Sequence, residues 1–418
     1  MPSTINLFPV FVLLAVFILI IVRRLGTLRL AIWQIMLGGA VVMLASSSIT
    51  PERSLAAVNA DVMLFLSGMF VVGVALVESG YLQHISFLIF KRAKTTDGLV
   101  LLILFVMGLF SAVLMNDTLA IIATPLVLYF ADRHRVEPKL LLLALCFAIT
   151  TGSVMSPIGN PQNLLIALDG RVSDPFLTFA KYLAVPTVIN LFLTYLVLKV
   201  FYAKAFHATP LVSMREELKD KPLARLARFS LIIVCSLIGV KIAITIFGMG
   251  AGFKLTYIAV VAAAPVLILS PRRFELLKLV DWHTLIFFAA MFVLMEGVWL
   301  SGAVQAAMDA AGNGLTSIEF ILGASVIVSQ ALSNVPFVAL YLPALTQGSV
   351  GVSGMMALAA GSTVAGNLFI LGAASNVIVV HNAERRGVVL SFVEFAKVGA
   401  VVTAVNIAVY WAFLRLIE

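Results

Sequence analysis

Met115-Asn116-Asp117-Thr118 is a polar interruption inside the apolar segment 97–131, and it decides how the chain is threaded. Basic residues flank this segment on both sides: Lys91, Arg92 and Lys94 before it, and Arg133, Arg135 and Lys139 after it. Short loops rich in Lys and Arg stay on the cytoplasmic side of a membrane, so a single crossing would leave one cluster on the wrong side. The sequence therefore predicts a re-entrant hairpin over 97–131 that enters from the cytoplasm and turns at Asn116.

A second polar interruption, Ser333-Asn334-Val335-Pro336, divides the apolar segment 316–347. We expect this segment to form a matching hairpin that enters from the outer side and turns near Asn334. Polar side chains at membrane depth are tolerated only where protein buries them or a water-filled cavity receives them. The two tips together predict a polar site inside the membrane.

The rest of the chain consists largely of long apolar runs. Of its 418 residues, 62% are hydrophobic and 11% are charged, whereas a soluble domain is roughly half apolar and about a quarter charged. The runs are continuous rather than alternating, which favours membrane-spanning helices over a β-barrel. We predict an all-α integral membrane protein with about ten transmembrane helices plus two re-entrant hairpins. The predicted spans are 5–22, 30–49, 61–80, 139–168, 182–203, 229–248, 255–270, 283–300, 354–380 and 391–415.

The net charge of +8 comes from basic residues in short loops between the apolar runs. This pattern is typical of orientation signals, so we expect a multi-pass protein of the cell inner (plasma) membrane and no nucleic-acid partner. The two cysteines and five scattered histidines give no metal-ligand spacing. Because the sequence also has no nucleophile elbow or phosphate-binding loop, we expect neither an enzyme nor a bound cofactor.

The two halves of the chain resemble each other in sequence. Ser67-Gly68-Met69-Phe70-Val71 corresponds to Ala289-Ala290-Met291-Phe292-Val293, and the stretch 158–163 corresponds to 371–376. On the predicted topology the first half starts outside and the second half starts inside, which predicts an inverted repeat of the kind found in many secondary transporters. The predicted units are repeat 1 (1–205), a cytoplasmic linker (206–228) and repeat 2 (229–418).

Each half also contains a second interruption, in the apolar run after its hairpin. The run 139–168 is broken at Ser156-Pro157-Ile158-Gly159-Asn160-Pro161-Gln162-Asn163, and the run 354–380 at Gly372-Ala373-Ala374-Ser375-Asn376. Proline and glycine unwind a helix and free carbonyl oxygens for a hard cation, while helix N-termini at a break attract an anion. Any one Asn or Ser here also fits a helix–helix hydrogen bond. As a set, we expect these residues to bind substrate and coupling ion: Asn116, Asp117, Thr118, Ser156, Gly159, Asn160, Asn163, Ser333, Asn334, Asn367, Gly372, Ser375 and Asn376.

Asp117 is the most informative single residue, because a carboxylate at membrane depth is expensive and usually functional. Three roles fit it: binding sodium, relaying a proton, or holding the hairpin tip through backbone N–H groups. Glu296 is a second candidate, and Lys241 either extends toward the interface or balances an anion. We interpret Glu78, Asp61 and His283, near the ends of spans, as interfacial.

At these residues the chain resembles the ion transporter superfamily, which includes divalent-anion:sodium symporters, citrate transporter-like permeases, arsenite permeases and one class of sodium:proton antiporters. The symporters carry Ser-Asn-Thr at both tips, where this chain has Asn116-Asp117-Thr118 and Ser333-Asn334-Val335. The breaks at 159–163 and 372–376 are similar to the family's break after each hairpin. The resemblance covers nearly the whole chain. It implies a rigid scaffold and transport domains that move like an elevator, often in a homodimer. It also implies that sodium binds between each tip and its adjacent break and that an anion binds between the two tips.

Two departures from the family pattern bear on the substrate. Val335-Pro336 replaces the second Thr, and the second break lacks the Pro-Pro pair of the symporters. Both argue against di- and tricarboxylates and against two equal sodium sites. The Asn-Asp-Thr form of the first tip is closer to the arsenite permease and antiporter branches.

Three functions are consistent with the sequence. The leading one is ion-coupled secondary transport of a small anion, with sodium or a proton as the driver. Arsenite efflux or sodium/proton antiport, with Asp117 as the ionisable group, is the second. A passive anion channel is the third, and it requires a continuous pore and no dependence on an ion gradient. The expected partners are a small anionic substrate, the lipid bilayer and a second copy of the chain in a homodimer.

Overall fold

The computed structural model describes residues 6–22, 24–25, 28–169, 171–206, 220–248, 252–348 and 350–417. Almost all of its regular structure is helical, as predicted. Two-residue strands β1 (Arg24–Leu25) and β2 (Leu28–Arg29) pair in an antiparallel turn between the first two helices. Among the described residues, six helices are long and apolar enough to cross a membrane.

The first half contains twelve α-helices, with two π-helical turns inside longer helices. They are α1 (Phe8–Val22), α2 (Ile32–Ala45), α3 (Pro51–Ala57), α4 (Ala60–Ser79), α5 (Tyr81–Phe90), α6 (Thr96–Leu102), the π turn Ile103–Met107, α7 (Gly108–Val113), α8 (Asn116–His134), α9 (Pro138–Ser153), α10 (Pro161–Leu168), α11 (Pro175–Phe179), the π turn Ala180–Ala184 and α12 (Val185–Phe201). A 3-10 turn at Ala203–Ala205 ends this half.

The second half also contains long helices, short connectors and broken helices. Its elements are α13 (Lys221–Ile246), α14 (Leu255–Leu269), α15 (Arg273–Leu279), α16 (Trp282–Leu300), α17 (Ala303–Ala311), the 3-10 turn Gly312–Thr316, α18 (Ile318–Leu332), α19 (Asn334–Gln347), α20 (Val352–Val364), the 3-10 turns Ala365–Asn367 and Ile370–Gly372, α21 (Ala374–Glu384) and α22 (Phe392–Ile417).

The helix predicted to start at 229 starts earlier. Asp220 accepts a hydrogen bond from the backbone N–H of Leu223 (2.9 Å), and Pro222 occupies the first turn of α13. An acidic cap followed by proline is a favourable helix start, so 220–228 is part of a helix rather than of a linker. Most of the predicted linker, 207–219, lies outside the described residues.

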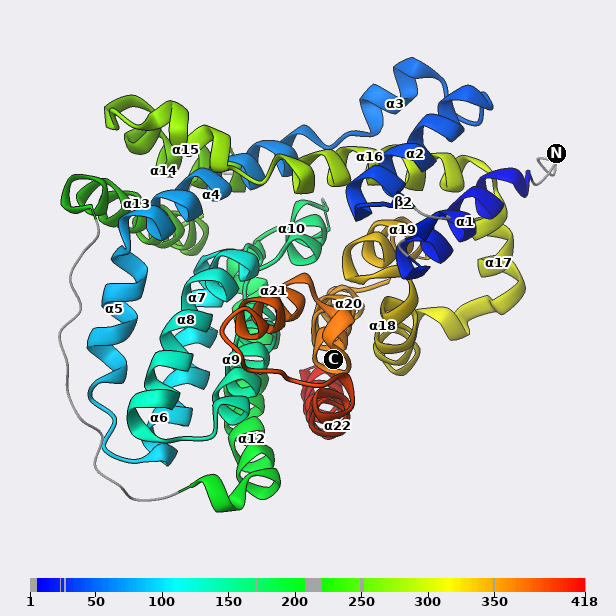
Figure 1. Ribbon diagram of the computed structural model, residues 1–418. Coiled ribbons are helices and arrows are strands. Elements are labelled where there is room, and N and C mark those ends of the chain that lie inside the picture. The colour runs from blue at the N-terminus through cyan, green and yellow to red at the C-terminus, as the bar shows by residue number, and fades with distance from the viewer. Residues whose placement is uncertain are drawn as a thin grey trace.

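The helices form two packed groups. In one, α4 packs against α13 and α14, and α16 packs against α2 and α3. Gly68 permits the contact between α4 and α14, because a Cβ at Gly68 would lie 2.7 Å from the carbonyl oxygen of Ala259. The other group contains α7–α10, α12 and α18–α22. Figure 1 shows α4 and α16 crossing the upper part of the view, above this second group.

Both predicted hairpins reverse direction at a short break. The first arm, Thr96–Val113, is long enough to cross a membrane, yet the chain turns at Leu114-Met115 and returns as α8. Phe130, late in α8, packs against Phe87 and Phe90 of α5, the helix that leads into the first arm. The start of the first arm and the end of the second arm therefore lie on the same side of the molecule. The second pair, α18 and α19, reverses at Ser333, whose φ of +67° is unusual for a residue other than glycine.

The two halves fasten their hairpins in the same way. In the first half, Asp97 on α6 accepts hydrogen bonds from Tyr195 (2.5 Å) and Lys199 (2.6 Å) of α12. In the second half, Glu319 on α18 accepts hydrogen bonds from Trp411 (2.8 Å) and Arg415 (2.9 Å) of α22. These clasps join the first arm of each hairpin to the last long helix of its half.

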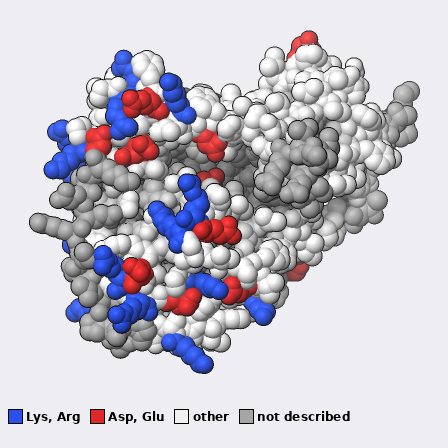
Figure 2. Space-filling view, viewed as in Figure 1, with Lys and Arg blue, Asp and Glu red and all other residues white. Residues whose placement is uncertain are grey.

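The surface fits a lipid environment. Large apolar side chains such as Phe11, Ile18 and Leu109 are more than half exposed, which is costly in water and favourable in lipid. Figure 2 shows that, in this view, Lys and Arg gather over the left and lower parts of the molecule, among them the parts that hold α6, α13 and α15. An integral membrane protein with basic loops accounts for both observations.

Candidate functional site

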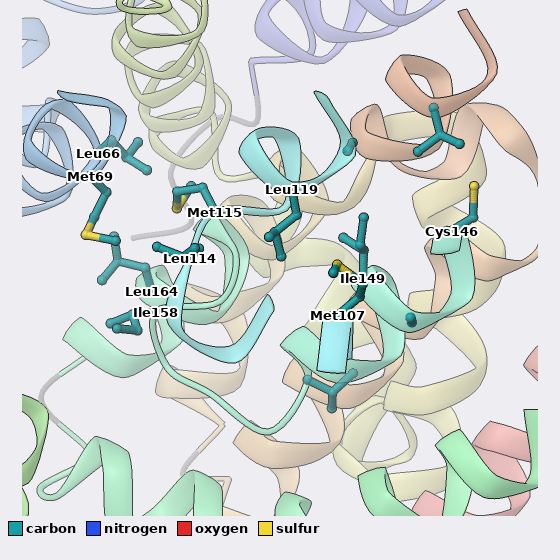
Figure 3. Packing of buried hydrophobic residues seen from close by; sticks show 14 of the residues in the cluster. Leu66, Met69, Met107, Leu114, Met115, Leu119, Cys146, Ile149, Ile158 and Leu164 are labelled. Atoms are coloured by element: carbon teal, nitrogen blue, oxygen red, sulfur yellow. The ribbon is translucent and has the colours of Figure 1, made fainter. Parts of the chain in front are cut away.

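A cavity of about 510 Å³ lies where the tips and breaks of both halves meet. From the first half it is lined by Met115, Asn116, Asp117, Asn160, Pro161 and Gln162, and from the second half by Ser333, Asn334, Val335, Gly372, Ala373, Ala374 and Ser375. Asn116 and Asn334, far apart in sequence, thus face one space. Figure 3 shows the apolar packing around the first tip, where Leu114 and Met115 lie near Ile158 and Leu164.

Four helices that follow the tips and breaks begin at this cavity. Asn116, Pro161, Asn334 and Ala374 are the first residues of α8, α10, α19 and α21, and all four line it. The first turn of a helix has free N–H groups and a partial positive charge, so each start can donate hydrogen bonds to an anion. Two of these starts come from each half of the chain.

At the first tip the polar side chains satisfy one another. The Ser111 hydroxyl donates to Asn116 Oδ1 (2.6 Å), and Asn116 Nδ2 donates to Ser153 Oγ (3.3 Å). Asn160 Nδ2 also donates to Ser153 Oγ (3.0 Å), while Asn160 Oδ1 accepts from the backbone N–H of Asn163 (2.9 Å). The tip and the break of the first half are therefore joined through one serine.

The first break is also held by side-chain hydrogen bonds. Asn163 Nδ2 lies within 3.3 Å of the carbonyl oxygens of Ser153, Val154 and Ser156, at the break between α9 and α10. Asn163 Oδ1 accepts from Thr363 of the second half (3.2 Å). Gly159 has no room for a side chain, because a Cβ there would lie 2.7 Å from the carbonyl oxygen of Ser111.

At the second tip, in contrast, buried oxygens lack partners. Within the part of the chain that the structure describes, six side-chain oxygens around this tip and break are buried without a hydrogen bond: Ser329 Oγ, Gln330 Oε1, Asn334 Oδ1, Asn367 Oδ1, Ser375 Oγ and Asn376 Oδ1. The amide nitrogens of Gln330, Asn367 and Asn376 are already used, toward Ala365 O, Thr151 Oγ1 and Gly366 O respectively. The unpaired atoms are therefore lone-pair acceptors, which is the ligand type of a hard cation.

Two small residues explain why the second tip is open. When 158–163 is aligned with 371–376, Gly366 and Ala373 stand where the first half has Ser153 and Asn160. Ser153, which accepts from Asn116, and Asn160, which donates to Ser153, thus have no polar counterparts at the second break. Gly366 cannot regain a side chain without movement, since a Cβ there would lie 2.9 Å from the Cβ of Ala373.

Asp117 also lines the cavity, as does Asp281 at the start of α16. The Asp281 carboxylate accepts hydrogen bonds from the N–H (3.0 Å) and the hydroxyl (2.6 Å) of Thr284, whereas no ion pair or hydrogen bond involves Asp117 within the described ranges. No Lys or Arg is among the described lining residues. A substrate anion at this site would therefore be held by helix N-termini and amides rather than by basic side chains.

The predicted site residues fall into two groups. Asn116, Asp117, Asn160, Ser333, Asn334, Gly372 and Ser375 line the cavity. Ser156, Gly159, Asn163, Asn367 and Asn376 lie in the buried layer behind it, where they hold the breaks. Thr118 faces α4 instead, where Gly73 leaves room for it: a Cβ at Gly73 would lie 2.6 Å from Thr118 Oγ1.

One wall of the cavity comes from residues that the sequence did not indicate. Trp33 and His283 stack at 5.1 Å between ring centroids, and both line the cavity with Asp281 and Phe288. His283 is therefore not merely interfacial. The other residues interpreted as interfacial form ion pairs, Asp61 with Lys254 (3.0 Å) and Glu78 with Arg272 (3.8 Å), and Glu296 pairs with Arg53 (3.1 Å). An acidic helix start such as Asp281 is readable in the sequence, but its place beside the tips is not.

Comparison with known proteins gives consistent relatives. An uncharacterized transporter of Mycobacterium tuberculosis is 29% identical over 383 residues, covering 86% of this chain and 87% of that protein. A silicon efflux transporter of rice (Oryza sativa subsp. japonica) is 26% identical over 410 residues, covering 83% of this chain and 84% of that protein. The crystal structure of the YdaH transporter of Alcanivorax borkumensis superposes with a TM-score of 0.62 at 13% identity, covering 99% and 98% of the two chains. At that identity the likeness establishes the fold. A family model described as Citrate transporter matches residues 15–353.

Proposed function

Because the chain belongs to the citrate transporter family, we propose that it is an ion-coupled secondary transporter of a small anion in the cell inner (plasma) membrane. The observation that carries this proposal is the convergence of four helix N-termini, two from each half, on one cavity. Each N-terminus carries about half of a positive charge, so the four together attract an anion without a basic side chain. The membership expected from the tip and break motifs is confirmed by the family match.

The coupling ion in this proposal is sodium, bound at the second tip. The unpaired oxygens of Asn334, Ser375 and Asn376 are buried and have no donor in the described residues. Each such oxygen costs about 1–3 kcal/mol when buried without a partner, and a bound cation removes that cost. The first tip, whose amides are already paired, supports the substrate cavity instead.

The proposed movement is of the elevator type. We interpret 1–205 and 229–418 as inverted repeats, because the order of elements is the same and the cross-contacts match: α10 packs on α19 and α20, and α21 packs on α8 and α9. The group that contains α4, α14, α2 and α16 is then the scaffold, and α7–α10, α12 and α18–α22 form the transport body. A second copy of the chain joined through the scaffold would complete a homodimer.

The test is uptake into proteoliposomes under imposed sodium and proton gradients, with citrate, succinate, sulfate and arsenite as substrates. A sodium-driven accumulation of one anion supports the proposal. Asn116→Ala and Asn334→Ala are each expected to abolish that accumulation while the protein still inserts into the membrane. Normal transport by both variants would refute the site.

Efflux of a small uncharged oxyacid is the second candidate function. It is favoured by the absence of Lys and Arg from the described cavity lining, by the carboxylates Asp117 and Asp281 there, and by the silicon efflux relative. An uncharged solute with several hydroxyl groups would accept from the helix N-termini and donate to the carboxylates. Adding silicic acid to the panel separates the two candidates, since silicic acid and the arsenite already in the panel are uncharged at neutral pH, whereas citrate, succinate and sulfate are anions.

A further inference from the structure

A second cavity, of about 410 Å³, lies at the opposite end of α16 from the first. The first cavity is lined by α16 residues from Asp281 to Phe288, and the second by α16 residues from Phe292 to Trp299. The second cavity also receives residues of α10 and α19, so it lies between the transport body and the scaffold, as the first does. The two cavities therefore share one interface.

Only one helical turn separates the two cavities. On α16, Phe288 lines the first cavity and Phe292 the second; on α19, the corresponding residues are Val335 and Ala339; on α10, they are Gln162 and Leu165. Three or four residues of α-helix rise by roughly 5–6 Å. Three helices thus pass from one cavity to the other over the same short distance, which makes the partition between the cavities thin.

The partition is mainly apolar. Phe288, Phe292 and Leu165 are each less than a tenth exposed, and Val335 and Ala339 are half-buried. A narrow apolar constriction blocks hydrated ions because water does not wet it. The barrier in this structure is therefore a few apolar side chains rather than a thick layer of packed protein.

The charge on both sides of the partition has one sign. Asp117 and Asp281 line the first cavity, and Asp169 and Glu296 line the second, whereas no Lys or Arg is among the described lining residues of either. Arg53 pairs with Glu296 (3.1 Å), but its side chain is mostly exposed. Carboxylates at both mouths of a narrow path raise the local concentration of cations along it.

We propose that the interface of α16 with α10 and α19 is a latent conduit for water and small cations, closed by the single apolar turn at Phe292. The conduit is separate from the coupled transport of an anion, which passes with the moving tips. Its solute has the opposite charge, and the partition residues to be changed, Phe292 and Ala339, line only the second cavity.

The test measures passive flux into vesicles that hold the purified protein. No substrate is present, sodium is at equal concentration on both sides, and only the added tracer has a gradient. Sodium entry and chloride entry are measured separately. Phe292→Ala is expected to raise sodium entry by about tenfold or more, since a constriction conducts once it is wet, and to leave chloride entry unchanged. Phe292→Trp keeps the partition filled and is expected to match the wild type.

The matched control is Ile286→Ala, on the same helix but lining neither cavity, with a side chain that is 38% exposed. Ala339→Ser, which places a hydroxyl in the partition with little change of volume, gives a second reading if Phe292→Ala fails to fold. Combining Phe292→Ala with Asn334→Ala should retain the sodium leak although coupled transport is lost. Sodium entry equal to the Ile286→Ala control in both partition variants, or chloride entry as fast as sodium entry, would overturn the conduit.

Discussion

Both hairpin tips place an asparagine at the first residue of the returning helix, but they differ in how their polar atoms are satisfied. At the first tip, Asn116 is bonded to Ser111 and Ser153, whereas at the second, Asn334 Oδ1 is buried without a partner in the described part of the chain. Gly366 and Ala373 stand where the first half has Ser153 and Asn160. The polar atoms of the first tip are therefore paired with one another, whereas the second tip leaves acceptor oxygens unpaired, which is the basis for proposing a ligand there.

The largest expected effect is the loss of transport in Asn334→Ala. This change removes an oxygen from the cation site and a side chain from the substrate cavity, so driven uptake should fall to the background of empty vesicles. Asn116→Ala should also stop uptake, but for another reason, since it breaks the network that joins the first tip to its break. Thermal unfolding in detergent separates the two: only Asn116→Ala should lose stability, by about 1–3 kcal/mol for the unpaired buried groups it leaves.

Ala373→Asn sharpens the comparison by giving the second break the amide that the first break has in Asn160. The new amide is expected to reach Asn334 and compete with the cation, raising the sodium concentration for half-maximal uptake by about tenfold, the equivalent of one hydrogen bond worth 1.4 kcal/mol. Ala374→Asn adds the same side chain one position away and lines the same cavity. An equal change in both variants would mean that the added side-chain volume, and not the pairing of Asn334, weakens sodium binding.

Asp117→Asn tests whether the first tip contributes an ionisable group. Asp117 faces the cavity with Asp281 and His283 as its titratable neighbours there. If Asp117 exchanges a proton during the cycle, the asparagine variant should lose the pH dependence of uptake between pH 5 and 8 while it keeps its sodium dependence. Asp281→Asn is the matched control on the scaffold side. An unchanged pH profile in Asp117→Asn would show that Asp117 is not the group that couples transport to protons.

The smallest effects are expected at the clasps. Lys199→Met and Arg415→Met each remove one exposed ion pair, with side chains 47% and 46% exposed, and exposed pairs contribute about 0–1 kcal/mol. Uptake should therefore stay near the wild-type level, and the unfolding midpoint should drop only slightly and by similar amounts in both variants. A much larger loss in one of them would show that the two hairpins are not fastened equivalently.

The sequence predicts the fold well where one physical signal dominates. Long apolar runs and basic loops locate the long helices, and an Asn or Asp inside an apolar run locates the tips, because lipid tolerates neither an unpaired amide nor a misplaced basic loop. The short helices α3, α5, α15 and α17 were not predicted, since helices of this length lie at the ends of spans, where hydropathy changes gradually. The start of α13 was missed although its signal, Asp220 before Pro222, is present in the sequence.

The site is less readable than the fold. The tip and break residues were found from composition, but Trp33, Asp281 and His283 became visible only once the structure brought α2 and α16 against the tips. The asymmetry between the tips illustrates the same limit. The exchange of Asn160 for Ala373 is visible in the alignment of the two halves, yet its consequence depends on which atoms Asn160 touches, and that is a property of the folded chain.

The most direct test of the account is a sodium titration of thermal unfolding on the purified protein, because it needs no knowledge of the substrate. A ligand that binds only the folded state stabilises it by about 2.7 kcal/mol at one hundred times its dissociation constant. Sodium, compared with choline at equal ionic strength, is predicted to raise the unfolding midpoint of the wild type and of Asn116→Ala, and to leave Asn334→Ala unchanged. A full sodium response in Asn334→Ala, or its loss in Asn116→Ala alone, would contradict the assignment of the cation to the second tip.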